Sequence, residues 1–294
     1  MGWRALASGG GAERQFRLKK VRAFSNKAHQ DLYTKNMNRI FIKNRKNQNI
    51  AVVVDENKNS NDLVFIMHGL GGFKEQPHIK TFASAFKKEG FTVILFDTTN
   101  TTGESDGKLV DATLTNYYED LEDIIGWAET QNWYREPFVL AGHSLGSASI
   151  ILFAEKYPEK IKALAPISAV VSGVLMEDAP DFMKIADEWR KKGIREWESS
   201  SQPGVIKKLK WSHVEDRRKY DVLPNANTLT MPALLIVGDN DDTTPPKHQK
   251  ILYDKLPGKK ELHVIRGAKH TFMSREHLEE IEKIFLNWIG TIKR

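Results

Sequence analysis

The chain has 294 residues, of which 40% are hydrophobic and 28% are charged, as is usual for a globular protein. This length allows one large α/β domain with an insertion, or two small domains. The longest apolar runs, such as 50–54 and 63–67, are only as long as a strand. The sequence therefore predicts no membrane-spanning helix and no stable membrane association.

The formal net charge is +6, and the basic residues are scattered among acidic ones along most of the chain. The clearest basic excesses lie at 14–22 and 207–219. Neither stretch is interleaved with aromatic residues as in a nucleic-acid-binding module, so we expect solvated faces and no nucleic-acid partner. The chain has no cysteine, which excludes disulfides, thiolate nucleophiles and cysteine-based zinc sites.

Residues 1–37 are predicted to be an N-terminal extension outside the folded domain. The stretch 1–12 lacks the apolar segment of a secretory signal, and its run Gly9 to Gly11 is typical of a flexible segment. We therefore expect a cytoplasmic protein, and the sequence leaves its oligomeric state open.

From Asn38 onward, strand-like and helix-like segments alternate. Short apolar or alternating runs predict strands at 40–43, 49–55, 63–67, 91–96, 138–141, 161–167, 233–237 and 261–265. Apolar stripes at helical spacing predict helices at 77–89, 116–131, 147–157, 247–256 and 277–292. This alternation predicts the α/β class, with a mostly parallel central sheet flanked by helices.

The segment 172–227 interrupts this alternation because it contains no convincing buried strand. It holds Trp189, Trp197 and Trp211 among many charged residues. We interpret it as an inserted helical cap, with 38–171 and 228–294 forming the core. The three tryptophans would then contact an apolar or aromatic part of a substrate, although they could equally be ordinary packing residues.

The strongest motif runs from Gly142 through Ser144 to Gly146, in the order Gly-x-Ser-x-Gly. It follows an apolar strand and precedes an apolar helix, which is the context in which this motif presents a nucleophilic serine. The flanking glycines provide room for the tight turn. The pattern therefore predicts Ser144 as a nucleophile, against the alternative of a purely structural turn.

A serine hydroxyl needs a base and an acid that orients the base. His270 lies in the loop between the last strand and the last helix, where the base is expected. The loop after the strand 233–237 holds three carboxylates, and we choose Asp241 as the acid, with Asp239 and Asp242 as fallbacks. The neighbouring aspartates are typical of turns and helix caps.

An oxyanion that forms during attack on a carbonyl needs preorganised N–H donors. The glycine-rich loop 68–72 predicts the backbone amide of Leu70 as one donor, and the helix start after the serine predicts that of Leu145 as the other. His68 has no second ligand at metal spacing, so we expect it to support this loop. No cofactor and no metal are expected.

These motifs together resemble the α/β-hydrolase superfamily, over roughly 38–292. The loops 68–72 and 267–270, the Phe96–Asp97 pair and the serine turn most resemble the cap-bearing serine esterases that include feruloyl (cinnamoyl) esterases and monoacylglycerol lipases. The segment 98–102 departs from the family, whose members usually carry an Arg-Gly-His-Gly type of sequence there. The resemblance implies hydrolysis of a small-molecule carboxylic ester, with a cap that shapes the pocket.

Other activities remain open because the same scaffold carries many. A peptidase, thioesterase, acyltransferase or C–C hydrolase would use the same three residues. A dehalogenase or an epoxide hydrolase is disfavoured, because each would have Asp at the position of Ser144. A non-catalytic ligand-binding protein is disfavoured by the complete Ser, Asp and His set.

Overall fold

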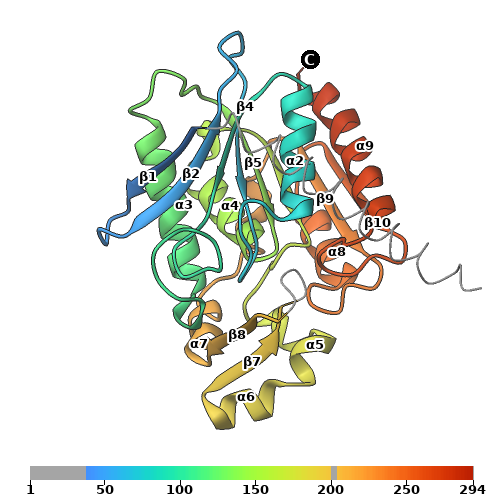
Figure 1. Ribbon diagram of the computed structural model, residues 1–294. Helices are drawn as coiled ribbons and strands as arrows, with labels where there is room; N and C mark the ends of the chain where they lie inside the picture. Colours follow the sequence, from blue (N-terminus) through green and yellow to red (C-terminus); the bar gives the residue numbers. More distant parts are fainter. Residues whose placement is uncertain (1–37, 200–203, 294) are drawn as a thin grey trace, which may run out of the picture. The chain divides into compact units, whose positions relative to one another are not determined.

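The computed structural model describes residues 38–199 and 204–293, so the predicted extension 1–37 lies outside the described residues. Eight of the described strands form one sheet in the order β1-β2-β4-β3-β5-β6-β9-β10 (Figure 1). These strands are β1 (Asn38–Lys43), β2 (Asn49–Asp55), β3 (Leu63–Met67), β4 (Thr92–Phe96), β5 (Phe138–His143), β6 (Ile161–Ile167), β9 (Ala233–Gly238) and β10 (Lys260–Ile265).

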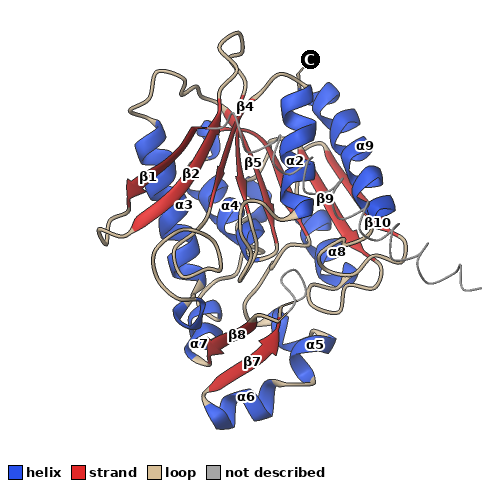
Figure 2. Cartoon of the chain, in the orientation of Figure 1, coloured by secondary structure: helices blue, strands red, loops and turns tan. Residues whose placement is uncertain are grey.

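Helices cover both faces of the sheet (Figure 2). The helices of the core are α2 (Pro77–Lys88), α3 (Leu114–Ala128), α4 (Leu145–Lys156), α8 (Pro246–Lys255) and α9 (Arg275–Ile292). On one face α2 packs on α9 through the rings of Phe82 and Phe285, whose centroids are 4.9 Å apart. On the other face α3 lies beside α4, and Lys156 Nζ donates to Glu122 at 2.7 Å. The predicted α/β class is confirmed.

The register of the sheet explains where a site can form. In this sheet β4, β3, β5, β6, β9 and β10 run parallel, and β2 pairs antiparallel to β4. Met67 at the end of β3 pairs with Phe96 of β4 and with Gly142 of β5. The loops that follow the parallel strands therefore leave the same edge of the sheet, which is where ligands bind in folds of this kind.

The segment between β6 and β9 lies beyond this edge (Figure 1). We call its residues 172–227 the insertion. It contains α5 (Pro180–Met183), α6 (Ala186–Lys192), α7 (Ser212–Arg217) and an antiparallel pair, β7 (Ile194–Glu198) and β8 (Ile206–Lys210).

The segment was predicted as a helical cap, and the hairpin of β7 and β8 departs from that prediction. In each strand two charged residues separate the two apolar ones, and β8 buries only Lys207 and Leu209. A half-buried pair with this pattern lacks the continuous apolar run that predicts a buried strand.

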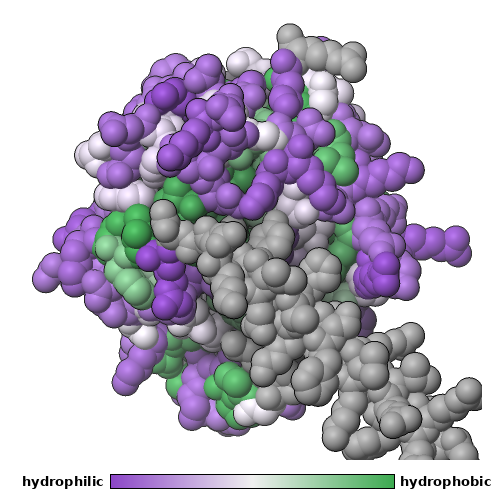
Figure 3. All heavy atoms as spheres, turned by 45° about the horizontal axis from the view of Figure 1, so that its top comes forward, coloured by the Kyte–Doolittle hydropathy of each residue, from purple (hydrophilic) through white to green (hydrophobic). Residues whose placement is uncertain are grey.

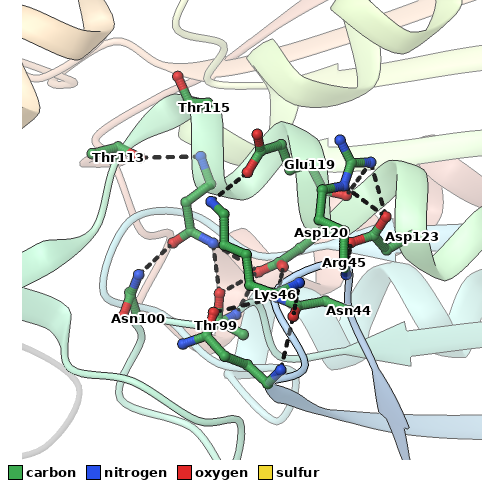
Figure 4. A network of polar contacts seen from close by, with 12 residues as sticks. Asn44, Arg45, Lys46, Thr99, Asn100, Thr113, Thr115, Glu119, Asp120 and Asp123 are labelled. Atoms are coloured by element: carbon green, nitrogen blue, oxygen red, sulfur yellow. Dashed lines mark hydrogen bonds and ion pairs between the residues drawn. The ribbon is translucent and has the colours of Figure 1, made fainter.

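A polar network fixes the turn between β1 and β2 against α3 (Figure 4). Asn44 Nδ2 donates to the buried Asp120 at 2.9 Å, and Arg45 Nε donates to Asp123 at 2.9 Å. Asp120 also accepts from the backbone N–H of Thr99 at 2.6 Å. The network thereby attaches the segment 98–102, which departs from the family pattern, to α3.

The coloured surface in Figure 3 is mostly hydrophilic, with separate apolar patches. The stretch 207–219, predicted to be a solvated face, is exposed only in part, because Lys207 and Arg217 are buried. The other basic stretch, 14–22, lies outside the described residues. No helix in the described ranges is long and apolar enough to cross a membrane.

Candidate active site

Ser144 sits at the turn between β5 and α4 with a backbone φ of 56° and ψ of −115°, which is unusual for a residue with a side chain. The turn is tight because backbone atoms pack against both neighbouring glycines. A Cβ at Gly142 would lie 2.8 Å from the carbonyl oxygen of Gly146, and one at Gly146 would lie 2.4 Å from that of His68. Only glycine fits at these two positions, so the turn holds the hydroxyl of Ser144 at the edge of the sheet.

Ser144, His270 and Asp241 form a continuous chain of hydrogen bonds. The Oγ of Ser144 lies 2.9 Å from His270 Nε2, and His270 Nδ1 lies 2.9 Å from Asp241 Oδ2. The side chain of Asp241 is fully buried, whereas that of His270 is 19% exposed. The structure thus brings together the three residues predicted from chain order, although they lie on three separate loops.

Of the three candidate carboxylates, only Asp241 contacts His270. Asp239 accepts from the backbone N–H of Gly267 at 2.7 Å, and the exposed Asp242 faces Lys184 at 3.4 Å. These two aspartates therefore hold loops, as expected of residues in turns.

Asp241 is stabilised as a carboxylate. Its burial raises its pKa, but the charge of His270 and hydrogen bonds from His270 and Thr244 outweigh that effect and lower the pKa overall. The backbone N–H groups of Thr243 and Thr244 donate to its Oδ1 at 3.0 and 2.8 Å. A carboxylate that is charged and fixed by several donors can orient an imidazole.

Sequence reasoning missed Thr244 and His143, which both support this chain. The hydroxyl of Thr244 lies 2.9 Å from Asp241 Oδ2 and 3.2 Å from His270 Nδ1. His143 Nε2 donates to the backbone carbonyl of His270 at 2.8 Å and so fixes the loop that carries the imidazole. Burial and the neighbouring histidines keep the pKa of His143 well below its usual value. The position of His143, immediately before Ser144 in the motif, could have indicated its role from the sequence.

The loop 68–72 lies against the serine turn, since a Cβ at Gly69 would be 2.9 Å from the Cβ of Ser144. The amide of Gly71 already donates to Tyr117 Oη at 3.2 Å, and that of Gly72 to the carbonyl of Gly69 at 2.9 Å. The amide of Leu70 is therefore the candidate donor of this loop. Leu145 is the first residue of α4, so its N–H has no acceptor within the helix.

The unusual segment 98–102 supports the same loop. The hydroxyl of Thr102 donates to the carbonyl of Gly71 at 3.0 Å, and that of Thr101 donates to the carbonyl of Gly72. His68 accepts from the backbone N–H of Thr98 at 3.1 Å. His68 thus joins two loops, which is the supporting role predicted for it.

A cavity of about 470 Å³ opens onto these residues. Ser144, His270, Leu70 and Leu145 line it from the core side. The insertion and the loop before it contribute the following lining residues: Val170, Met176, Asp181, Phe182, Ile185, Trp189, Arg195, Trp197, Lys207, Leu209, His213 and Arg217. In the described parts of the chain, no cluster of three or more His, Asp or Glu side chains is placed to hold a metal ion.

The three tryptophans of the insertion differ in position. Trp189 and Trp197 line the cavity, whereas Trp211 is absent from its wall. Trp211 instead packs edge-on against Trp189, with ring centroids 5.5 Å apart, and stacks on Phe182. This position favours the alternative interpretation of Trp211 as a packing residue, which supports the wall from behind.

Comparison with known proteins places this geometry in context. A family model described as "Serine aminopeptidase, S33" matches residues 58–221 and 214–277. An Escherichia coli protein described as an "uncharacterized 31.7 kDa protein in traX-finO intergenic region" is 27% identical over 251 residues, 74% of this chain and 86% of its own length. The mitochondrial palmitoyl-protein thioesterase ABHD10 of Bos taurus is 24% identical over 159 residues, 54% of this chain and 50% of its own length.

Among solved structures, Est1E from Butyrivibrio proteoclasticus with bound ferulic acid superposes with a TM-score of 0.69. The match covers 86% of this chain and 98% of Est1E at 22% sequence identity. At this identity the likeness shows a common fold, which is the α/β-hydrolase fold predicted from the motifs.

Proposed function

We propose that this chain, which belongs to the serine aminopeptidase S33 family (Hydrolase_4), hydrolyses carboxylic esters or thioesters. The reaction passes through an acyl-enzyme intermediate on Ser144. The observation that carries this proposal is the chain of 2.9 Å hydrogen bonds from Ser144 through His270 to Asp241. The similarity to a thioesterase and to an esterase structure supports the same class of reaction.

In the proposed mechanism, His270 Nε2 accepts the proton of the Ser144 hydroxyl as Oγ attacks the carbonyl carbon of the substrate. The amides of Leu70 and Leu145 stabilise the oxyanion that forms. His270 then donates the proton to the departing alcohol or thiol, which leaves an acyl group on Ser144. Water attacks this ester with His270 as base, and the acid product leaves.

The walls of the cavity support a substrate with an apolar stem. Val170, Met176, Phe182, Ile185 and Leu209 contribute apolar surface beside Ser144. Such a wall suits an acyl chain or an aromatic ring of the cinnamoyl type, and an acylglycerol is a further candidate. The insertion would then act as a cap that selects the substrate.

A peptidase acting on free N-termini is the alternative that the family description suggests. Such an enzyme needs an available carboxylate to bind the substrate's ammonium group. The two carboxylates in the cavity wall, Asp181 and Asp242, both contact Lys184, at 3.3 and 3.4 Å. This lysine offsets one of the two negative charges, and Arg195, Lys207 and Arg217 in the same wall repel an ammonium group. The charge of the cavity therefore favours ester or thioester hydrolysis over aminopeptidase activity.

Labelling with a fluorophosphonate and turnover of p-nitrophenyl acetate, an acyl thioester and an aminoacyl p-nitroanilide test the proposal. We expect one label per chain at Ser144, and a loss of about 10⁶ in kcat for Ser144→Ala. Ser84→Ala is the matched control, because Ser84 donates to Glu282 at 2.7 Å and lies away from His270. Full labelling of Ser144→Ala would refute the nucleophile assignment, and preferential turnover of the anilide would favour the peptidase.

A further inference from the structure

The wall of the cavity carries three cationic side chains from the insertion: Arg195, Lys207 and Arg217. Within the described residues, none of the three forms an ion pair with a carboxylate. This is unusual for Lys207 and Arg217, which are buried, because buried charges in proteins are normally paired.

Arg217 is the most isolated of the three. It is only 5% exposed, and its buried Nε and Nη2 atoms have no hydrogen-bond partner among the described residues. Its guanidinium lies 5.0 Å from the centre of the Phe182 ring, which supports one face of the group. The neighbouring acid Glu177 is already engaged by Arg218, whose Nε and Nη2 donate to it at 2.6 and 3.0 Å.

Lys207 and Arg195 have spare donors as well. Lys207 is 7% exposed, and its Nζ donates to the carbonyl of Gly71 at 2.7 Å, beside the candidate donor Leu70. An ammonium group has three protons, so this bond leaves capacity for another acceptor. The Arg195 guanidinium lies 4.9 Å from the ring of Trp197 and 5.9 Å from that of Trp189, and it forms no hydrogen bond within the described residues.

The carboxylates of the wall do not balance these cations. Asp181 contacts Lys184 and accepts from the hydroxyl of Thr243 at 2.9 Å, and Asp242 contacts the same lysine. Lys269, next to His270, adds a further positive charge to the lining. The cavity therefore has an excess of positive charge beside an apolar wall.

Burial lowers the pKa of Arg195, Lys207 and Arg217, which reflects the cost of holding each charge away from water. Removing a charge from water without a partner is strongly unfavourable. A cavity that holds such groups is stabilised when an anion enters and supplies the missing acceptors, because charge-assisted hydrogen bonds are among the strongest in proteins.

We propose that this cavity binds an anionic oxygen group, a carboxylate or a phosphate, of the same substrate molecule whose ester or thioester bond Ser144 attacks. Arg217 is the principal ligand of the anion, and Lys207 and Arg195 contribute to it. The inference rests on the proposed function and defines the substrate class more narrowly: an acyl compound with an apolar stem and a negatively charged group.

Paired substrates test this assignment. On the acyl side, p-nitrophenyl monoesters of glutaric, adipic and suberic acids are compared with the same esters carrying a terminal carboxamide. On the leaving-group side, 4-acetoxybenzoate is compared with 4-acetoxybenzamide, and 4-acetoxyphenyl phosphate represents a phosphate. In at least one pair we expect kcat/KM to be about tenfold or more higher for the anion. The ratio is taken within each variant, so that a general loss of activity cancels.

Arg217→Met should reduce this ratio toward one, Lys207→Met should reduce it in part, and Arg217→Lys should retain some of it. Arg218→Met is the matched control, because Arg218 is exposed and already paired with Glu177. It should keep the full ratio. The Tm of Arg217→Met should not fall, since a buried charge without a partner is replaced by an apolar side chain of similar length. A fall in Tm would indicate a structural role for Arg217.

A binding measurement separates failure of this inference from failure of the proposed function. Calorimetry on Ser144→Ala with glutarate, adipate, suberate, 4-hydroxybenzoate and inorganic phosphate needs no turnover. We expect at least one of them to bind, and the binding to be weakened by Arg217→Met. Ratios near one in every wild-type pair, or no binding of any anion, would overturn the anion site whether or not esters are hydrolysed. Binding without turnover would retain it and refute the hydrolase.

Discussion

His270 Nδ1 donates to Asp241 Oδ2 at 2.9 Å, and Thr244 contacts both partners through one hydroxyl. Asp241 is 2% exposed and accepts further bonds from two backbone N–H groups. The imidazole therefore has one orientation and one tautomer, with Nε2 free to accept the proton of Ser144. Asp241 can therefore orient the imidazole, whereas Asp239 and Asp242 in the same loop do not contact it.

The first prediction concerns this carboxylate. Asp241→Asn should reduce kcat for an ester by about 10⁴, because an amide can stabilise the wrong imidazole tautomer and cannot stabilise the imidazolium. Asp242→Asn should have little effect, since Asp242 faces Lys184 on the surface. Steady-state kinetics of the two variants would decide the assignment, and a larger loss for Asp242→Asn would contradict it.

The second prediction concerns Tyr117, whose hydroxyl donates to the carbonyl of Gly69 at 3.1 Å and accepts from the amide of Gly71 at 3.2 Å. These bonds fix the backbone on both sides of Leu70. Tyr117→Phe should therefore lower kcat by about tenfold while KM changes little, because the oxyanion forms only after binding. Tyr118→Phe, which removes a bond to Glu122 on the outer side of α3, is the control. Equal losses in both variants would show a general effect on α3.

The sequence predicted the parallel core well because its strands are continuous apolar runs and its loops carry recognisable residues. β2, β3 and β6 match the prediction at both ends, and each of the other predicted strands differs by one or two residues at one end. Ser144, His270 and Asp241 could be chosen because each follows a buried strand in a fixed chain order.

The positions of the side chains in the insertion were less predictable, because contacts with residues distant in the sequence decide which of them are buried. In the sequence Lys207 is one of several lysines in 207–210, yet packing against the loop at Gly71 buries its side chain. Arg217 and Arg218 are adjacent and chemically identical in the sequence, but only one enters the cavity wall. Trp211 and Trp197 are distinguished in the same way, by which face of the insertion each one occupies.

The third prediction concerns Glu155 on α4, whose burial raises its pKa from 4.5 to about 7. Its Oε1 has no hydrogen-bond partner in the part of the chain that the structure describes. The unfolded chain releases this proton at lower pH than the folded protein does. Glu155 should therefore reduce the free energy of unfolding as the pH rises from about 4.5 to about 7, and the penalty remains above that range.

Glu155→Gln should raise Tm by a few degrees near pH 8 and leave it almost unchanged near pH 4.5, roughly the lower end of this range. Glu159→Gln, an exposed neighbour, is the control and should follow the wild-type pH dependence. Scanning calorimetry across this pH range makes the comparison. Parallel Tm curves for wild type and Glu155→Gln would contradict the inferred titration.

The last prediction separates the two tryptophans that the sequence treats alike. Trp197 lines the cavity and contacts Arg195, whereas Trp211 packs behind the wall on Phe182 and Trp189. Trp197→Ala should raise KM for esters with a bulky acyl group and leave Tm within about 2 °C, because it removes ligand contacts and little internal packing. Trp211→Ala should destabilise the protein by about 2 kcal/mol or more, since it opens a space under the wall. Thermal unfolding and a series of acyl p-nitrophenyl esters distinguish the two effects, and a Trp211→Ala variant with normal Tm and altered acyl preference would restore the original assignment of this residue to the substrate.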